Sequence, residues 1–457
     1  MRTPEQMKEL IIKVAEKDKR IRAVMLGGSR ANADAPRDDW MDYDVGYVID
    51  CEKSIKAMTK DLTWMDVLGD EVSVRITSAE KPDWSDGESY FILTQYADGT
   101  RIDLTFATVD AYHKTLESGD HGPAEIWLDK DGVFNLGHDN GLKYYVEAPD
   151  EKTYLVCCNE FWWIMPYVAK GLCRQEMSFA QTFLTHIREE LVKALGWYVG
   201  MKNETPVTIG KFGKYLQKLL PPEIWREFAA TYAGGEYPQM WSALFMAGEL
   251  FGKVAQQVAD HYGFAYPYKD EQRVTALLKS MQSDATKRIR ATTCAFTGRR
   301  PQALPWGYDD GHPDARAFAK RISAEIERSY DAGYRNFICG MAQGVDLLAC
   351  EQAILLKKTT CPELVLVAAI PGKDQTRNWP SEQIERYNAC LKHCDVRRIL
   401  SQFCNVETYH YRNRWMVDNA SRLIAVWEGD PSGGTGRTVA YAESKGVDVV
   451  KIWWDEK

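Results

Sequence analysis

Apolar and polar residues follow three different patterns along this chain, and each pattern predicts a different kind of structure. In the first 148 residues, short apolar runs predict strands, and residues 4–18 carry apolar residues at the spacing of an amphipathic helix. Two further runs flank the Asp98-Gly99 turn in SYFILTQYADGTRIDLTFATVD and predict a hairpin. This part of the chain therefore predicts a sheet covered by helices.

The other two patterns lie beyond residue 148. From about residue 150 to residue 280, aromatic and aliphatic residues recur at helical spacing, which predicts a helical bundle. A charged segment at 268–293 is expected to begin as a helix and end as irregular chain. Apolar strands then alternate with helices, which is typical of a doubly wound parallel sheet. We predict an α/β multidomain protein with a mixed-sheet domain over 1–148, a helical bundle domain over 149–284 and a Rossmann-like domain over 285–457.

The composition narrows the class of protein. The chain has 457 residues, of which 45% are hydrophobic, and a formal net charge of −8, which disfavours non-specific binding to nucleic acid. Apolar runs such as 364–370 are too short to span a bilayer, and the N-terminus has no signal-peptide core. The 11 cysteines include no CxxC pair, which fits reduced and mostly buried thiols. We expect a soluble, cytoplasmic protein without a membrane partner, and nucleic acid is not an expected partner.

Candidate chemistry is concentrated in residues 23–50. An apolar strand ends there at Gly27-Gly28-Ser29, and a second strand opens with Asp42-Tyr43-Asp44. Because side chains alternate along a strand, the two aspartates point to the same side. Neighbouring carboxylates repel each other unless a cation lies between them, and Mg²⁺ binds one or two protein carboxylates together with phosphate oxygens. The N–H groups of the glycine turn can face a phosphate. A surface hairpin with two solvated acids explains the same residues when they are taken alone.

A third acid, Asp103, lies in the strand RIDLT of the same predicted sheet. Gly28-Ser29, then Asp42 thirteen residues later, then Asp44 and Asp103, resembles the nucleotidyltransferase superfamily related to DNA polymerase β. The helical segments NEFWWIMPYVAKGLCRQE, REELVKALGWYVG and TIGKFGKYL are similar to those of the aminoglycoside 6-adenylyltransferases, which modify streptomycin. The resemblance covers about residues 1–280.

This resemblance implies transfer of AMP from ATP to a drug hydroxyl with release of pyrophosphate, and it makes Mg²⁺ and ATP the expected cofactors. It implies that Asp42 and Asp44 hold Mg²⁺. Asp103 would either bind a second metal ion or accept the proton of the attacking hydroxyl, and the residues leave that choice open. Gly28, Ser29 and Arg30 would then contact the ATP phosphates. Lys211 and Lys214, which follow a Thr-Ile-Gly turn, are further candidate phosphate contacts. A solvated helix start explains the two lysines equally well.

The helical domain is expected to hold the aminoglycoside. Streptomycin-like drugs carry guanidinium groups, for which acidic and aromatic side chains are the expected partners. The candidates are Glu160, Trp163, Glu189 and Glu190. A Trp-Trp pair at helical spacing is more often part of a core, and adjacent glutamates on an apolar helix can form a solvated edge.

The last third of the chain resembles a second family. The runs CAFTGRRP, GMAQGVDLLACE and AAIPGKDQTRNWP, with the segment 411–446, are similar to the YpsA-like group of the SLOG superfamily. Glycine turns at helix N-termini predict a phosphate-binding crevice in such a sheet. The candidate residues for a nucleotide ligand are Gly298, Arg299, Gly340, Gly344, Asp346, Gly433, Gly434 and Thr435. Residues 431–438 depart from the PGGxGTxxE signature of related phosphoribohydrolases, which favours nucleotide binding over hydrolysis. Ordinary strand-to-helix turns in a structural domain are the alternative.

Three functions follow from these patterns. The first is an aminoglycoside adenylyltransferase with an appended nucleotide-binding domain. The second is a nucleotidyltransferase that acts on a protein or RNA target and is gated by a nucleotide signal sensed by the C-terminal domain, because a resistance enzyme needs no sensor. The third is a non-enzymatic ligand-binding protein with a vestigial aspartate cluster.

Overall fold

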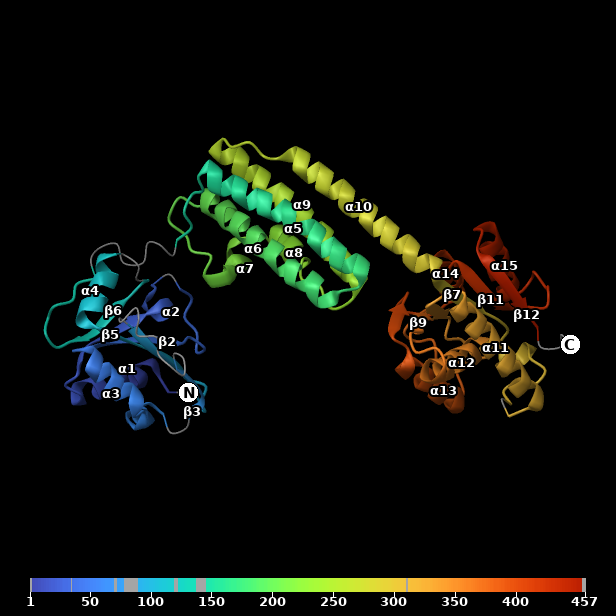
Figure 1. The fold of residues 1–457 in the computed structure, drawn as a ribbon, viewed down its shortest axis with the longest axis horizontal. Helices are drawn as coiled ribbons and strands as arrows, with labels where there is room; N and C mark the ends of the chain where they lie inside the picture. Colours follow the sequence, from blue (N-terminus) through green and yellow to red (C-terminus); the bar gives the residue numbers. More distant parts are fainter. Residues whose placement is uncertain are drawn as a thin grey trace. The chain divides into compact units, whose positions relative to one another are not determined.

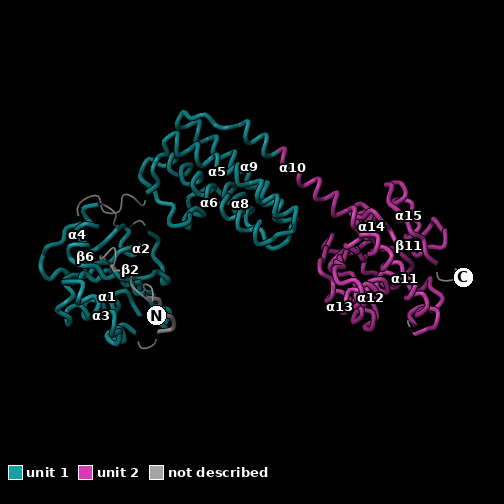
Figure 2. Tube along the Cα trace, viewed as in Figure 1, with its two compact units in different colours: residues 1–275 teal, residues 276–457 magenta. Residues whose placement is uncertain are grey.

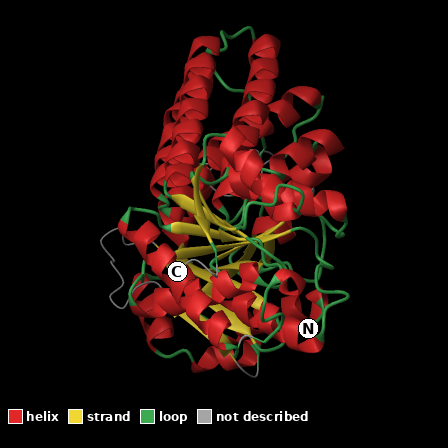
Figure 3. Cartoon of the chain, turned by 90° about the vertical axis from the view of Figure 1, so that its right-hand side faces the viewer, coloured by secondary structure: helices red, strands yellow, loops and turns green. Residues whose placement is uncertain are grey.

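The computed structural model describes residues 2–33, 35–69, 72–77, 89–118, 122–136, 145–309 and 311–453. The chain divides into two compact units, residues 1–275 and 276–457 (Figure 2). Helices outweigh strands in the described chain, as the colouring of Figure 3 shows. None of the helices in these ranges combines the length and the apolar character needed to cross a membrane.

The first unit opens with a mixed sheet, drawn in blue to cyan in Figure 1. Its six strands lie in the order β3-β4-β5-β2-β1-β6. Its strands are β1 (Ile21–Gly27), β2 (Tyr43–Ile49), β3 (Val72–Thr77), β4 (Ser89–Tyr96), β5 (Arg101–Thr108) and β6 (Glu125–Asp129). Strands β2 and β5 are parallel, and the other neighbouring pairs are antiparallel. The helices of this part are α1 (Pro4–Lys17), α2 (Gly28–Ala31), α3 (Glu52–Lys60) and α4 (Val109–Glu117), with a 3₁₀ helix at Thr63–Leu68.

Helix α1 covers one face of this sheet. Its apolar residues, spaced three or four apart, place Met7 and Ile11 in a fully buried cluster with Tyr47 and Phe106. The Tyr47 hydroxyl donates to the carbonyl of Ile11 at 3.0 Å, so its one polar group is satisfied inside the core. The alternation along β2 that buries Tyr43, Val45 and Tyr47 leaves Asp44 on the other face of the sheet.

The second part of this unit is a helical bundle. It consists of α5 (Glu151–Arg174), α6 (Met177–Lys202), α7 (Leu216–Leu219), α8 (Pro222–Ala229) and α9 (Tyr237–Tyr262), with a 3₁₀ helix at Lys211–Gly213. Its core is aromatic, since the rings of Phe161 and Phe251 stack with centroids 3.7 Å apart and Trp162 meets Phe251 edge-on at 5.9 Å. The prediction of helices in this region agrees with the structure.

Helix α10 (Tyr268–Ala291) runs across the division between the compact units. We expected irregular chain at the end of this segment, and that expectation is wrong. The segment contains neither glycine nor proline, and Lys287 pairs with Asp284 one turn away at 3.7 Å, so a charged surface helix continues to Ala291. The boundaries of the three predicted domains stay a prediction.

The second unit is an α/β unit with an all-parallel sheet in the order β10-β9-β8-β7-β11-β12. Its strands are β7 (Thr293–Thr297), β8 (Asn336–Cys339), β9 (Val365–Ile370), β10 (Val396–Ile399), β11 (Arg422–Val426) and β12 (Asp448–Ile452). Its helices are α11 (Pro313–Asp331), α12 (Val345–Thr359), α13 (Ser381–His393), α14 (Val406–Asp418) and α15 (Gly434–Ser444), with a 3₁₀ helix at Pro301–Ala303.

Alternating strand residues of this sheet enter two separate cores. Phe296 and Ile424 face a cluster that includes residues of α11, α12 and α13. Their neighbours Ala295 and Ala425 face a cluster with residues of α14 and α15. Helices therefore cover both faces, and the strand order reverses where β7 lies next to β11. A crevice at the carboxyl ends of those two strands is where open α/β sheets bind ligands.

Candidate functional site

Strands β2 and β5 bring the three predicted aspartates to one part of the mixed sheet. Asp44 lies directly opposite Asp103 in the register of these parallel strands. Asp42 precedes β2 by one residue, so it shares the side of Asp44. Residues that are far apart in the sequence thus form a cluster of carboxylates because β2 and β5 pair in parallel.

The glycine turn after β1 packs against this cluster. Gly27 pairs with Asp44 in the antiparallel register of β1 and β2. Gly28 has a φ of 63°, and a Cβ atom on it would lie only 1.8 Å from Oδ2 of Asp44. A side chain is therefore excluded here both by the backbone conformation and by the carboxylate.

Arg101 lies among the three carboxylates, and the sequence reasoning gave it no role. Its Nε and Nη2 donate to the two oxygens of Asp103, both at 2.9 Å, in the bidentate geometry of a strong ion pair. Its Nε also lies 3.6 Å from Oδ2 of Asp42. The signal that could have found this residue was its position two residues before Asp103 on the same strand face.

The electrostatics of the cluster show unbalanced negative charge. Burial raises the pKa of Asp44, and repulsion from Asp103 and Asp42 raises it further. Burial also raises the pKa of Asp42; Asp103 adds to the rise, and Arg101 opposes it. These half-buried carboxylates accordingly favour a further cation nearby.

The donor set of this cluster fits Mg²⁺ in part. Asp42 and Asp44 offer adjacent oxygen ligands of the kind that Mg²⁺ takes alongside phosphate oxygens. Arg101 already engages Asp103, and in the parts of the chain that the structure describes no three Asp, Glu, His or Cys side chains are arranged to hold a metal ion. A metal site here would rest on the pair Asp42 and Asp44, and the roles of these two residues and of Asp103 as metal ligands stay predictions.

The predicted phosphate ligands divide into two groups. Arg30 donates to the carbonyls of Met41 and Asp42 at 2.6 and 3.0 Å, and its guanidinium lies 3.8 Å over the ring of Tyr43. It thus fixes the start of β2, and a contact with phosphate stays a prediction. Ser29 follows Gly28 in α2, beside the carboxylates.

The lysines belong to a strained turn at the edge of the bundle. Gly210, Phe212 and Gly213 all have φ between 58° and 75°, and the Phe212 side chain is 86% exposed. Glycine adopts such a φ without strain, but Phe212 does not, and strained non-glycine backbone clusters at ligand-binding positions. Lys211 and Lys214 are exposed on this turn, and the charge of Lys214 opposes the rise of the Asp42 and Asp44 pKa values. The sequence reasoning found these lysines but not the strain.

The four predicted aminoglycoside contacts lie on helices α5 and α6 of the bundle. Trp163 on α5 is 63% exposed, unlike its buried neighbour Trp162, so it is available to a ligand. Glu189 pairs with His186 at 3.2 Å and Glu190 with Lys193 at 2.7 Å, both within α6. Glu160 on α5 is half-buried. Within the described residues no hydrogen bond or ion pair joins these four side chains to the three aspartates, and their role stays a prediction.

A second site lies in the α/β unit at the reversal of strand order. A cavity of about 240 Å³ opens there, lined by Phe296, Thr297, Gly298, Arg299, Arg300, Ala303, Ala342, Asp346, Tyr409, His410, Arg412, Asn413, Met416, Gly434, Thr435 and Thr438. Five of the eight predicted residues are among them, namely Gly298, Arg299, Asp346, Gly434 and Thr435. The Thr435 hydroxyl donates to the carbonyl of Gly298 at 3.0 Å, which ties the α15 turn to the end of β7.

The charged residues of this cavity are partly engaged by the protein itself. Arg299 pairs with Glu428 and, at 3.4 Å, with Asp430. Asp346 is buried and accepts from Nη1 of Arg412 at 3.2 Å, while Nε of Arg412 is buried without a hydrogen-bond partner. A polar atom of this kind beside a cavity favours a polar ligand.

The other three predicted glycines do not line the cavity but lie against Arg299 and Arg412, which do. A Cβ on Gly340 would lie 1.8 Å from Nη1 of Arg412, and one on Gly344 would lie 2.5 Å from the carbonyl of Arg299. Gly433 caps α15 beside Arg299. The sequence reasoning missed Tyr409, which carries Arg300 5.4 Å over its ring. Its signal was its helical spacing with the polar residues Arg412 and Asn413 on α14.

Comparison with known proteins identifies both units. The family model of streptomycin adenylyltransferase matches residues 1–281. The chain belongs to the streptomycin adenylyltransferase family. Membership in this family makes the chain an enzyme, a nucleotidyltransferase, as the first resemblance implied. The family model of the YspA SLOG family matches residues 294–452, which confirms the second resemblance.

Relatives cover the adenylyltransferase part of the chain almost completely. An aminoglycoside 6-adenylyltransferase of Campylobacter jejuni is 30% identical over 275 residues, which are 59% of this chain and 93% of that protein. One from Bacillus subtilis (strain 168) is 31% identical over 276 residues, which are 59% of this chain and 95% of that protein. A crystal structure of an aminoglycoside 6-adenyltransferase from Bacillus subtilis has 24% identity, covers 62% of this chain and 99% of its own, and gives a TM-score of 0.32.

Proposed function

We propose that the protein transfers AMP from ATP to a hydroxyl of an aminoglycoside, with streptomycin as the first candidate. The observation that carries the proposal is the pairing of Asp44 with Asp103 beside Gly28, within a member of the streptomycin adenylyltransferase family. Relatives named as aminoglycoside 6-adenylyltransferases support the substrate class.

In the reaction, the drug hydroxyl oxygen forms a bond to the α-phosphorus of ATP. The bond between that phosphorus and the oxygen bridging to the β-phosphate breaks, and pyrophosphate leaves with the electron pair. The hydroxyl proton passes to a base near the α-phosphate. Asp103 is the candidate base, and Arg101 fixes both of its carboxylate oxygens in position.

Asp42 and Asp44 would hold Mg²⁺. When bound, Mg²⁺ supplies positive charge that neutralises the phosphate oxygens. The Gly28-Ser29 turn would approach the phosphates closely because it carries no Cβ at Gly28. Lys214, whose charge already acts on both aspartates, would contribute attraction for the triphosphate.

The test is a transfer assay with the full chain. The protein is incubated with Mg²⁺, one aminoglycoside from a panel that includes streptomycin, and ATP, GTP or CTP, and the products are analysed by mass. We expect an AMP adduct on streptomycin. The absence of any nucleotide adduct on all aminoglycosides, with label from ATP on lysate proteins or RNA instead, would establish the alternative target class.

We further propose that the α/β unit binds a nucleotide ligand in the cavity between β7 and β11. Arg300 stacked on Tyr409 offers a cation and an aromatic face, and the threonines of α15 offer hydroxyls. Titration of the full chain with AMP and ADP should give binding that Arg300→Ala weakens by about tenfold. Equal affinity of the wild-type protein and this variant for the nucleotide would show that Arg300 does not contact the ligand.

A further inference from the structure

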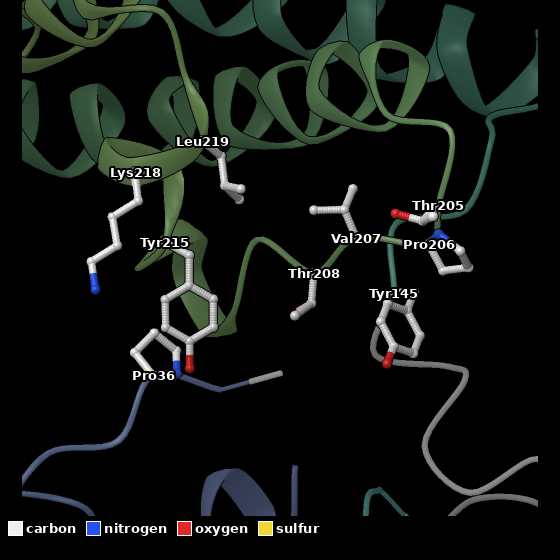
Figure 4. Close-up of a pocket in the computed structure, with 9 residues that line it drawn as sticks. All are labelled: Pro36, Tyr145, Thr205, Pro206, Val207, Thr208, Tyr215, Lys218 and Leu219. Carbon is white, nitrogen blue, oxygen red and sulfur yellow. The ribbon is translucent and has the colours of Figure 1, made fainter. Parts of the chain in front are cut away.

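A second cavity lies in the first unit, beside the turn that carries Lys214. It has a volume of about 530 Å³ and is lined by Pro36, Tyr145, Thr205, Pro206, Val207, Thr208, Tyr215, Lys218 and Leu219 (Figure 4). Most of the lining comes from one stretch of the bundle, between α6 and α8. None of the residues discussed so far as substrate contacts lines it.

The walls of this cavity are held in place by the backbone. The N–H of Val146 donates to the carbonyl of Val207 at 2.8 Å, which joins the segment carrying Tyr145 to the segment carrying Val207. The N–H of Tyr215 donates to the carbonyl of Ile209 at 2.9 Å and closes the strained turn. Figure 4 shows the rings of Tyr145 and Tyr215 on different sides of the space, with Val207 and Thr208 between them.

Tyr215 is positioned by the absence of a side chain at Gly210. A Cβ on Gly210 would lie 2.8 Å from two atoms of the Tyr215 ring and 2.7 Å from Cγ of Lys214. The glycine therefore lets the ring pack onto the turn, and the same turn places one aromatic face in the cavity and the neighbouring lysine toward the aspartates. The cavity residue Tyr215 and the predicted phosphate contact Lys214 are thus neighbours on one turn.

The charge of the lining decides which ligand fits. No described lining residue is acidic, and Lys218 contributes a positive charge that has no carboxylate partner among the described residues. A polycationic aminoglycoside would be repelled here. Two tyrosine rings, two prolines, valine and leucine, with two threonine hydroxyls, suit a flat uncharged ring with hydrogen-bonding edges and a hydroxylated sugar.

We infer that this cavity binds the nucleoside part of ATP, with Tyr145 and Tyr215 as aromatic walls and Val207 as its floor. The inference rests on the proposed function, since ATP is the nucleotide of that reaction. The aminoglycoside then approaches from another side, and the adenosine end of the nucleotide is recognised by the bundle rather than by the sheet.

The test separates the nucleoside from the phosphates. Val207→Trp fills the cavity and Tyr145→Ala removes one wall, while Val133→Trp, on an exposed valine outside both sites, is the matched control. Binding of ATP, adenosine and inorganic tripolyphosphate is measured by calorimetry on the full chain with Mg²⁺. We expect both cavity variants to weaken ATP and adenosine by about tenfold and to leave tripolyphosphate unchanged. The control should behave as the wild-type protein does.

The outcomes distinguish this inference from the proposed reaction. ATP affinity that is unchanged in both cavity variants, with a raised KM for streptomycin, would overturn the inference and assign the cavity to the drug. ATP binding that depends on Val207 and Tyr145, without transfer to any aminoglycoside, would uphold the inference and overturn the proposed reaction. A wild-type protein that binds no ATP would overturn both.

Discussion

Asp44 of β2 and Asp103 of β5 lie directly opposite each other on two parallel strands. Like charges at this position repel, and burial adds to the cost of ionising Asp44. This pair of acids therefore does not stabilise the fold, and carboxylates whose pKa is perturbed in this way are typical of functional sites.

Asp44→Asn should abolish transfer without destabilising the fold. Removing one of two repelling charges should leave the free energy of unfolding equal or slightly higher. Activity should fall by roughly a hundredfold or more, because a carboxylate that would hold the cation at the phosphates is lost. Activity and thermal unfolding are measured on the same preparation. Asp260→Asn, on the exposed end of α9, is the control and should change neither property. Full activity in Asp44→Asn would contradict the assignment.

Gly28→Ala should inactivate the enzyme through the position of Asp44. The new Cβ would occupy the space of Oδ2 of Asp44 and force that carboxylate away. Gly132→Ala is a close control, because Gly132 has a φ of 65° and nothing lies within 4 Å of its added Cβ. Both variants bear a similar backbone strain of about 1 kcal/mol or more. Only Gly28→Ala should lose transfer, and equal activities would show that the approach of Gly28 to Asp44 is not needed.

Arg101→Met should increase the affinity for a divalent cation. Arg101 is the cation that now neutralises Asp103 and approaches Asp42, so its removal leaves the carboxylates free to attract another positive charge. Mn²⁺ binding followed by electron paramagnetic resonance should give a Kd lower by about tenfold. At the same time kcat should fall because Asp103 loses its fixed orientation. Arg101→Lys keeps the positive charge and should bind Mn²⁺ as weakly as the wild-type protein does. Tighter Mn²⁺ binding in Arg101→Lys as well would exclude competition between the charge of residue 101 and the divalent cation.

Arg412→Met should destabilise the α/β unit. Arg412 and Asp346 form an ion pair whose side chains are only 5% and 9% exposed, so the variant leaves a buried carboxylate uncompensated. The expected loss is about 3–5 kcal/mol in the free energy of unfolding. Lys451→Met breaks a surface pair with Glu443 in the same unit and should cost less than about 1 kcal/mol. Chemical denaturation of both variants provides the comparison, and similar losses would contradict a buried pair.

Acid should remove a small stabilising contribution of Asp18. Hydrogen bonds from Arg20, the shortest at 2.5 Å, hold the pKa of Asp18 below its ordinary value. A carboxyl with a depressed folded-state pKa stabilises above its unfolded pKa of about 3.9, and this stability is lost as the pH falls through the folded value. Asp18→Asn should therefore be less stable than the wild-type protein at pH 7 by under about 1 kcal/mol, since the pair is partly exposed. The difference should disappear as the pH falls through the lowered folded-state pKa of Asp18.

The sequence by itself determined the elements and the identity of the acids. Short segments carry the helical spacing of α1 and of the bundle, and the alternation of strands with helices in the C-terminal part. The order of Gly28, Asp42, Asp44 and Asp103 can also be read along the chain. Periodicity and local turn chemistry are enough to fix such segments. The one wrong expectation, irregular chain at the end of α10, came from taking charged sequence as a break in structure. A charged segment without glycine or proline, with one ion pair between Asp284 and Lys287, continues as a surface helix.

Only the tertiary structure decided how these segments meet. The parallel pairing of β2 with β5, the insertion of Arg101 between Asp42 and Asp103, and the engagement of Arg30 with the backbone at residues 41 and 42 depend on distances between segments far apart in the chain. The same holds for the ion pair of Asp346 with Arg412 and for the cavity around Tyr145 and Tyr215. Sequence patterns reveal which face a residue occupies, but the partner on the facing segment is set by packing, and that packing determines which charges are free to bind a ligand.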